Sequence, residues 1–207
     1  MLFTPEHMLL FLGAAILVTI SPGPDNLATL SIGLSRGRQA AVGFGVGCGC
    51  GCLFHTALAA LGVSAVLQSS PEAFTALKWC GAAYLAWLGI EALRSRGTGI
   101  SEFQGEQQSG LRYFAKGLFA NAINPKVAIF FLSFLPQFVV ESTGRAELQM
   151  MGLGLIFTVQ AILIFATIGF FSGRIGHSLR SRPRVGVWLD RFTGVLFITL
   201  ALKLALA

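Results

Sequence analysis

Two apolar stretches of this chain are interrupted by proline, and a charged residue follows each interruption. The first interruption is Ser-Pro-Gly-Pro-Asp-Asn at Ser21–Asn26, and the second is Asn-Pro-Lys at Asn124–Lys126. Proline removes a backbone donor and clashes with the preceding turn, so a continuous helix through either segment is disfavoured. Backbone groups freed inside a membrane must be buried in protein or line a wet cavity. The pattern is therefore typical of the broken helices that form transporter substrate sites.

The composition places these segments in a membrane protein. The chain has 207 residues, of which 54% are hydrophobic and only 12% are charged, whereas charged residues make up about one quarter of a typical soluble domain. Helices of about 20 residues are needed to cross the hydrocarbon layer. Six such spans are expected, at Met8–Leu30, Ala40–Leu67, Phe74–Leu93, Phe114–Val140, Leu148–Phe171 and Val185–Leu206.

The distribution of basic residues predicts the orientation. The net charge of +6 comes mainly from Arg and Lys in the connectors after the first, third and fifth spans, which excludes a nucleic-acid partner and instead places these connectors in the cytoplasm. Both termini are then expected to face the periplasm. The N-terminal segment lacks a basic n-region and carries Glu6, so we interpret it as part of the first span and not as a signal peptide.

Three spans per half imply that a duplicated half would be inverted in the membrane. We expect a first repeat over residues 1–93, a cytoplasmic linker over 94–113 and a second repeat over 114–207. The fold class predicted is an all-α integral membrane protein with two inverted three-helix repeats and broken first and fourth helices. Matches in the same order support the duplication: Pro24-Asp25 with Pro125-Lys126, Gly47 with Gly152, His55 with Gln160, and Gly81 with Gly194.

The charges at the two breaks are candidates for ligand contact. Asp25 falls in the first turn of a half-helix, where the helix dipole favours an anion, and a simple helix cap would also explain it. Lys126 opposes the dipole and costs on the order of 2.5–3.5 kcal/mol at membrane depth, so an anion should compensate it. Asp25 could do so in an ion pair between the halves, or a ligand carboxylate could do so while Asp25 meets the ligand ammonium. Asp25 is also the candidate for proton coupling.

These motifs together resemble the lysine-exporter (LysE/RhtB) family. They include the two breaks, a glycine-rich second span, Gly81–Leu85 with Leu88-Gly89, and Phe130-Phe131 followed by Leu135–Phe138. The resemblance implies a bacterial inner-membrane exporter of amino acids or close derivatives, driven by the proton motive force. It also implies a functional centre formed by Pro22, Gly23, Pro24, Asp25, Asn124, Pro125 and Lys126, to which we add Asn26 as the last residue of the first break.

Other polar residues of the spans allow further interpretations. His55 and Gln160 are either polar groups facing the bundle interior or contacts to the ligand or proton. Cys48, Cys52 and His55 share one helical face, which could form a soft-metal site in a heavy-metal efflux protein. Close helix packing explains the surrounding glycines without a metal. A membrane thiol–disulfide carrier is a further alternative, although no cysteine lies beside the prolines.

The chemistry expected of this chain is transport without catalysis. No catalytic residue, resident metal or cofactor is predicted. One acid and one base suit a zwitterionic amino acid, and the absence of a second intramembrane acid disfavours lysine or arginine as substrate. Protons are the expected coupling ion, the lipid bilayer is the expected environment, and glycine-lined faces would permit a homodimer.

Overall fold

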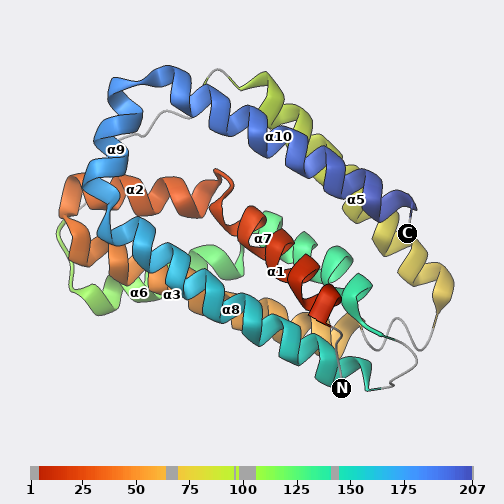
Figure 1. Ribbon diagram of the computed structural model, residues 1–207. Coiled ribbons are helices and arrows are strands. Elements are labelled where there is room, and N and C mark those ends of the chain that lie inside the picture. Colours follow the sequence, from red (N-terminus) through yellow and green to blue (C-terminus); the bar gives the residue numbers. More distant parts are fainter. Residues whose placement is uncertain (1–4, 64–69, 96, 98–105, 141–144, 207) are drawn as a thin grey trace.

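The computed structural model describes residues 5–63, 70–95, 97, 106–140 and 145–206. Within these ranges the protein is helical and contains no strand, which confirms the predicted all-α fold class (Figure 1). A π-helical turn over Ala59–Val63 extends α3, and α7 continues through Phe130–Phe134 and Leu135–Phe138. The α-helices are α1 (Pro5–Ile20), α2 (Pro24–Arg36), α3 (Arg38–Leu58), α5 (Pro71–Arg94), α6 (Gly110–Ala122), α7 (Pro125–Ile129), α8 (Ala146–Phe170), α9 (Ser172–Ser181) and α10 (Pro183–Leu206).

Both predicted breaks are present. α1 and α2 form the first bent pair, with an angle of 50° between them, and the residue between the two prolines, Gly23, has an extended backbone with φ −169°. α6 and the segment Pro125–Phe138 form the second bent pair, with an angle of 51°. In the second pair the side chain of Asn124 accepts a hydrogen bond from the backbone N–H of Lys126 and so caps the new helix.

The remaining spans are long straight helices. α3 with its extension, α5, α8 and α10 are each long and apolar enough to cross a membrane, and the bent pairs raise the number of candidate spans to as many as 6. Leu155 and Leu163 on α8 and Phe192 on α10 leave about half or more of their side-chain surface exposed. Such large apolar side chains at the surface are expected of helices that face lipid.

The long helices pack as two antiparallel pairs. α3 lies against α8, where a Cβ atom at Gly49 would be 2.7 Å from the Cα atom of Ile162. α5 lies against α10, where a Cβ atom at Gly89 would be 2.9 Å from the carbonyl oxygen of Gly194. Glycine at these positions lets the backbones approach closely, which is how helices gain packing energy in lipid. Antiparallel pairing of second with second and third with third helices is what inverted repeats require, and the duplication itself stays a prediction.

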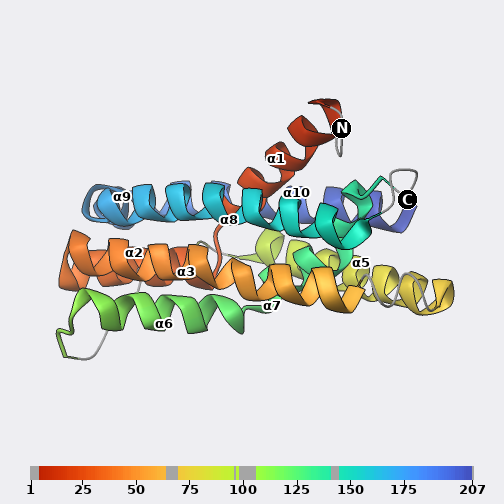
Figure 2. The ribbon, with the colours of Figure 1, turned by 90° about the horizontal axis from the view of Figure 1, so that it is seen from below.

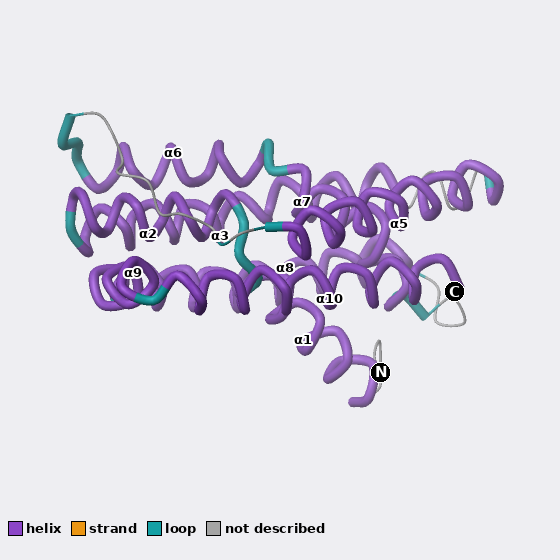
Figure 3. Tube along the Cα trace, turned by 90° about the horizontal axis from the view of Figure 1, so that it is seen from above, coloured by secondary structure: helices purple, strands orange, loops and turns teal. Residues whose placement is uncertain are grey.

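The helices form layers. Figure 2 shows α8, α9 and α10 in one layer and α2, α3 and α5 in a second, with α6 beyond the second layer and α1 leaving the first layer at an angle. The opposite view in Figure 3 shows the same order, with short loops at the two breaks. A cluster of aromatic rings from Phe130, Phe131, Phe134 and Phe157 fills the interior beside the second break, with ring centroids 4.9 to 6.1 Å apart.

Several boundaries differ from those expected. The first span continues to Arg36 instead of ending at Leu30, and α6 begins at Gly110, one turn before the expected start at Phe114 and inside the expected linker. The connector between the fifth and sixth spans contains α9, which the sequence analysis did not anticipate. Ile175 and Leu179 are partly buried, whereas Arg174 and Ser178 are exposed, so the helix is amphipathic and too short and polar for hydropathy alone to reveal it.

Candidate functional site

The two bent pairs meet at their breaks, and Asp25 is held there by the opposite pair. The amide of Asn121, at the end of α6, donates a hydrogen bond of 2.8 Å to Oδ2 of Asp25, at the start of α2. Asp25 is 5% exposed and Asn121 is fully buried. This is the only hydrogen bond to the Asp25 carboxylate within the described residues, although a carboxylate can accept about four. The carboxylate therefore keeps acceptor capacity for a further partner.

Lys126 makes the reciprocal contact. Its ammonium group, at the start of α7, donates to the carbonyl oxygen of Ser21 at 2.9 Å and to the Ser21 hydroxyl at 3.0 Å, just beyond the end of α1. The same group lies 5.6 Å from the ring centroid of Phe197, within cation–π range. Lys126 is 8% exposed. An ammonium group has three N–H donors, so one remains for a ligand.

Asp25 and Lys126 do not pair with each other. In the part of the chain that the structure describes, no direct ion pair joins them, and each is bound to a polar group of the opposite bent pair. Their charges are nevertheless close enough to interact through space, since both line one cavity. Of the two arrangements left open by the sequence, the structural ion pair is not formed among the described residues.

The cavity between them is small. Its volume is about 20 Å³, which is room for about one water molecule and too little for an amino acid. Thr19, Gly23, Asn26 and Asn124 also face it. In this structure an amino acid therefore does not fit between the two charges unless the surrounding residues move apart. The remaining lining residues are Val18, Cys52, Asn121, Val127, Phe157 and Phe165.

Asn26 and the prolines shape the break. The amide of Asn26 donates to the carbonyl oxygens of Thr19 at 3.0 Å, Ile20 at 3.2 Å and Ser21 at 3.1 Å. These carbonyls belong to the end of α1, where no intrahelical donor remains for them. Pro22 and Pro24 prevent the helix from supplying those donors, so Asn26 stabilises the break that the prolines create.

Close contact at the break also explains Gly23. A Cβ atom at this position would lie 3.1 Å from the Nζ atom of Lys126, so a larger residue would press on the ammonium group. In the second break, Pro125 begins α7 and the Asn124 side chain caps it. Five residues of the predicted centre thus determine the backbone conformation at the two breaks: Pro22, Gly23, Pro24, Asn124 and Pro125.

His55 on α3 and Gln160 on α8 each bind a residue near the bend of a bent helix pair. Nε2 of His55 on α3 donates to the carbonyl oxygen of Asn121 at 2.9 Å, and the amide of Gln160 on α8 donates to the hydroxyl of Thr19 at 2.9 Å. Each side chain thus reaches the end of the first helix of the opposite half. His55 is 1% exposed, and its bond to a carbonyl, which can only accept, requires the proton on Nε2. Neither residue lines the cavity. Each binds a residue that does, namely Asn121 for His55 and Thr19 for Gln160.

The four cysteines are free thiols in the structure. Cys48 and Cys52 are buried on α3, and Sγ of Cys52 lies 3.6 Å from Oδ1 of Asn121. Among the described residues, no group of three His, Cys, Asp or Glu side chains could hold a metal ion. Cys50 is partly buried and Cys80 is exposed. No observation therefore favours the metal-efflux or thiol-carrier alternative.

Three residues of the site were not predicted from the sequence: Asn121 binds Asp25, Ser21 binds Lys126, and Thr19 binds Asn26 and Gln160. Ser21, Thr19 and Asn121 lie in the last turn before a break or just beyond it, and all three are at most 5% exposed. A signal for them was present, because each is a polar residue of an apolar span that lies one to four residues before the first proline of a break. The last carbonyls of a helix have no intrahelical donor, so the carbonyl of Ser21 is free to accept from Lys126. The polar side chain of Asn121 at the other helix end donates to Asp25.

Comparison with known proteins is consistent with this geometry. The chain is 30% identical over 200 residues to an uncharacterized membrane protein of Vibrio cholerae, covering 96% of both chains. It is 29% identical to a homoserine/homoserine lactone efflux protein of Salmonella typhimurium, covering 99% of this chain and 98% of the relative. It is 28% identical to a threonine efflux protein of the same organism, covering 97% of this chain and 99% of the relative. No solved structure matches the chain.

The family match covers both breaks and leaves out only the residues before residue 16, which include most of α1. Residues 16–207 match the family described as LysE type translocator. This confirms the resemblance that the motifs predicted, and the helical fold with its candidate membrane spans agrees with it. The chain therefore belongs to the LysE type translocator family.

Proposed function

We propose that this protein exports neutral amino acids across the bacterial inner membrane. The observation that carries the proposal is that one buried acid and one buried base line the same cavity without pairing. Buried charges in membrane proteins are costly and mark substrate or ion pathways. The names of two relatives, a homoserine/homoserine lactone efflux protein and a threonine efflux protein, support amino acids as the substrate class.

The chemistry of the two charges suits the common part of an amino acid. The Asp25 carboxylate would accept hydrogen bonds from the ligand's ammonium group, and the Lys126 ammonium would donate to the ligand's carboxylate. Each of them keeps unused hydrogen-bonding capacity among the described residues. Charge-assisted hydrogen bonds are about twice as strong as neutral ones, so this pair would compensate the ligand for its lost hydration.

The transport cycle follows from the closed state of the site. The cavity of about 20 Å³ must enlarge to admit a ligand, and the Asn121–Asp25 and Lys126–Ser21 hydrogen bonds hold it closed. Rocking of one inverted half against the other would break them and expose the site alternately to each side. Protonation of Asp25 would remove one charge from the site in part of the cycle, which couples export to the proton motive force.

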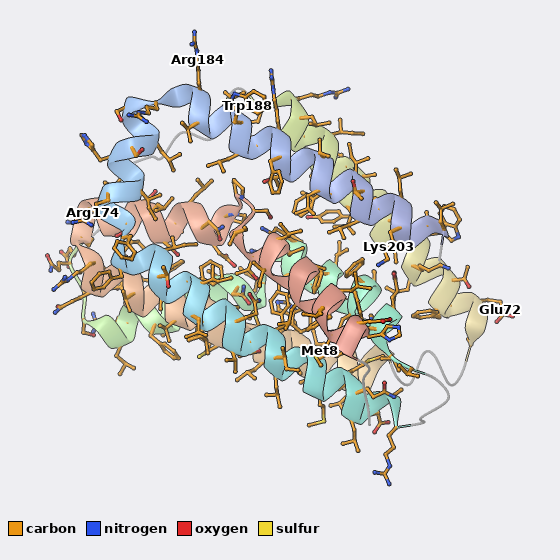
Figure 4. The ribbon with its side chains drawn as sticks, in the orientation of Figure 1. Met8, Glu72, Arg174, Arg184, Trp188 and Lys203 are labelled. Atoms are coloured by element: carbon orange, nitrogen blue, oxygen red, sulfur yellow. The ribbon has the colours of Figure 1, made fainter. Side chains whose placement is uncertain are left out.

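The proposed orientation places the α9 end of the molecule in the cytoplasm. Figure 4 shows Arg174 and Arg184 at or near that end, and Lys203 toward the other. Arg36 and Arg38, where α2 meets α3, also lie at the α9 end, since α2 packs on α9. By the positive-inside rule this end is cytoplasmic. The start of α1 and the end of α10 would then face the periplasm (Figure 1).

Efflux from preloaded cells tests the proposal. Cells are fed a mixed dipeptide panel, and the amino acids that leave are measured for the wild type, Asp25→Asn and Glu147→Gln. Glu147 is an exposed acid in the first turn of α8 and serves as the matched control. The proposal expects export by the wild type and by Glu147→Gln, and export at least about tenfold slower by Asp25→Asn. If no amino acid leaves faster from cells with the wild-type protein than from cells without it, the proposal is wrong.

A further inference from the structure

A second, larger space lies on the other side of the first break. Its volume is about 220 Å³, and it is bounded by residues of α1, α2, α8, α9 and α10. It exceeds the engineered cavity of about 150 Å³ that binds benzene inside a protein, so it has room for a small organic group. Its apolar walls include Leu27, Leu30, Ile168, Ile175 and Leu179.

This pocket and the charged cavity lie on opposite sides of the first break and share a wall. Asn26 lines both spaces. Thr19 and Gly23 face the charged cavity, whereas their neighbours Ile20 and Pro22 face the apolar pocket. The broken segment therefore separates a cavity lined by an acid and a base from a pocket lined mainly by apolar side chains.

The chemistry of the pocket selects against polar ligands. Asn26 is the polar side chain among its described lining residues, and the Asn26 amide group already donates to the carbonyls at the end of α1. No charged side chain is among the residues that line the pocket in the described ranges. The amide oxygen of Asn26 is the one side-chain acceptor among the described lining residues, so a cationic or hydroxylated ligand group would find few partners there, which is costly, whereas an aliphatic group needs none.

We propose that this pocket binds the side chain of the exported amino acid, which makes the substrates neutral amino acids with aliphatic side chains of about the size of leucine. The inference rests on the proposed function, because it places the ammonium and carboxylate groups of the ligand at Asp25 and Lys126. Asn26 forms a wall common to the two spaces, so a ligand held by its charges in the enlarged charged cavity would place its side chain in the apolar pocket once the bent pairs have moved apart at Asn26. A lipid tail is the competing occupant, and it would not discriminate between substrates.

Filling the pocket is the first test. Ile168→Phe adds volume to the α8 wall of the pocket, and Leu163→Phe adds it on the same helix at a position that is 63% exposed. Export of leucine and of alanine is measured for both variants and the wild type in proteoliposomes. Each buried methylene contributes about fourfold to binding. We expect the wild type to favour leucine over alanine by at least about tenfold.

The variants should then differ by substrate. We expect Ile168→Phe to lower leucine export at least about tenfold and leave alanine export nearly unchanged, and Leu163→Phe to change neither. The inference is overturned if Ile168→Phe lowers leucine export and alanine export equally, which is the result expected from a lost lipid contact or from disturbed packing. It is also overturned if Ile168→Phe lowers neither export rate. If the wild type exports threonine and alanine as well as leucine, this inference fails and the proposed function stands. Absence of export of any amino acid would refute the proposed function itself.

Enlarging the pocket gives an independent test that does not depend on the folding of Ile168→Phe. Leu30→Ala removes a side chain that is 6% exposed and faces the pocket, and Leu155→Ala is the control at an exposed site on α8. We expect Leu30→Ala to raise phenylalanine export relative to leucine export by severalfold, and Leu155→Ala to leave the ratio unchanged. An unchanged ratio in Leu30→Ala would overturn the inference.

Discussion

The ammonium group of Lys126 donates a hydrogen bond of 2.9 Å to the carbonyl oxygen of Ser21, and so joins the start of α7 to the end of α1. The bond between Asn121 and Asp25 joins the same two bent pairs in the opposite sense, from the end of α6 to the start of α2. Each charge thus binds the helix end that precedes the other charge. Both bonds would have to break when the pairs separate, so the two charges also hold the closed state.

Removing the negative charge at the site should stop export without preventing folding. In Asp25→Asn the new amide oxygen can still accept the hydrogen bond from Asn121, so we expect normal insertion. The variant loses the ionic contact to a ligand ammonium, and hydrogen bonds to charged groups contribute about 1.5–3 kcal/mol. Export should therefore fall at least about tenfold. Initial efflux rates per inserted protein measure this, and a rate equal to that of Glu147→Gln would contradict it.

Exchanging the two charges should not restore export. In Asp25→Lys combined with Lys126→Asp, a lysine would face the amide of Asn121 and an aspartate would face the carbonyl oxygen of Ser21. The second contact places two acceptors together, and a buried unpaired charge is strongly destabilising. Lys126→Ala, which removes the ammonium group proposed to bind the ligand carboxylate, should lose export, and we expect the double variant to be equally inactive. Recovered efflux in the exchange variant would show that a direct ion pair between the halves is what the two residues provide.

Removing the thiols should leave export intact. Changing all four cysteines to alanine deletes small side chains that hold neither a metal nor a disulfide in the described structure. We expect the amino acid efflux of the wild type to persist, and resistance to metal salts to stay unchanged. Growth on zinc and copper salts, measured beside efflux, checks this prediction. Export lost with the cysteines alone would instead revive the redox or metal alternatives.

Glycine packing between α3 and α6 should be sensitive to a single methyl group. A Cβ atom at Gly47 would clash with the carbonyl oxygen of Phe114 and lie 2.9 Å from the backbone nitrogen of Leu118, whereas at Gly13 it would meet no atom within 4 Å. Overpacking costs about 1–3 kcal/mol. Gly47→Ala should therefore lower the melting temperature in detergent by several degrees, at roughly 2–4 °C per kcal/mol. Gly13→Ala is the matched control, and equal melting temperatures would contradict the packing account.

The sequence was enough to locate both breaks, because the conformational effect of proline is local. Pro22 and Pro24 exclude a regular helix whatever surrounds them, and Pro125 does the same in the second half. Asp25 and Lys126 could be selected for the same reason, since a charge in an apolar span needs a partner. Both residues line one cavity in the structure, and their role in ligand binding stays a prediction.

The partners of the two charges could not be derived from the sequence, because they depend on how the halves pack. Asn121 reaches Asp25 only because α6 ends beside the start of α2. The direct ion pair was an equally valid reading of the sequence, and the packing of Ser21 against Lys126 is what replaces it. α9 was missed because its amphipathic pattern is short and resembles a polar connector.

Ligand binding to the purified protein tests the central claim most directly. The exported amino acid is titrated onto the wild type, Lys126→Gln and Lys203→Gln, where Lys203 is an exposed cation whose ammonium lies 5.6 Å from the ring centroid of Phe138. If the ligand carboxylate binds at Lys126, Lys126→Gln should weaken binding at least about tenfold, and Lys203→Gln should bind like the wild type. Wild-type affinity in Lys126→Gln would contradict the account.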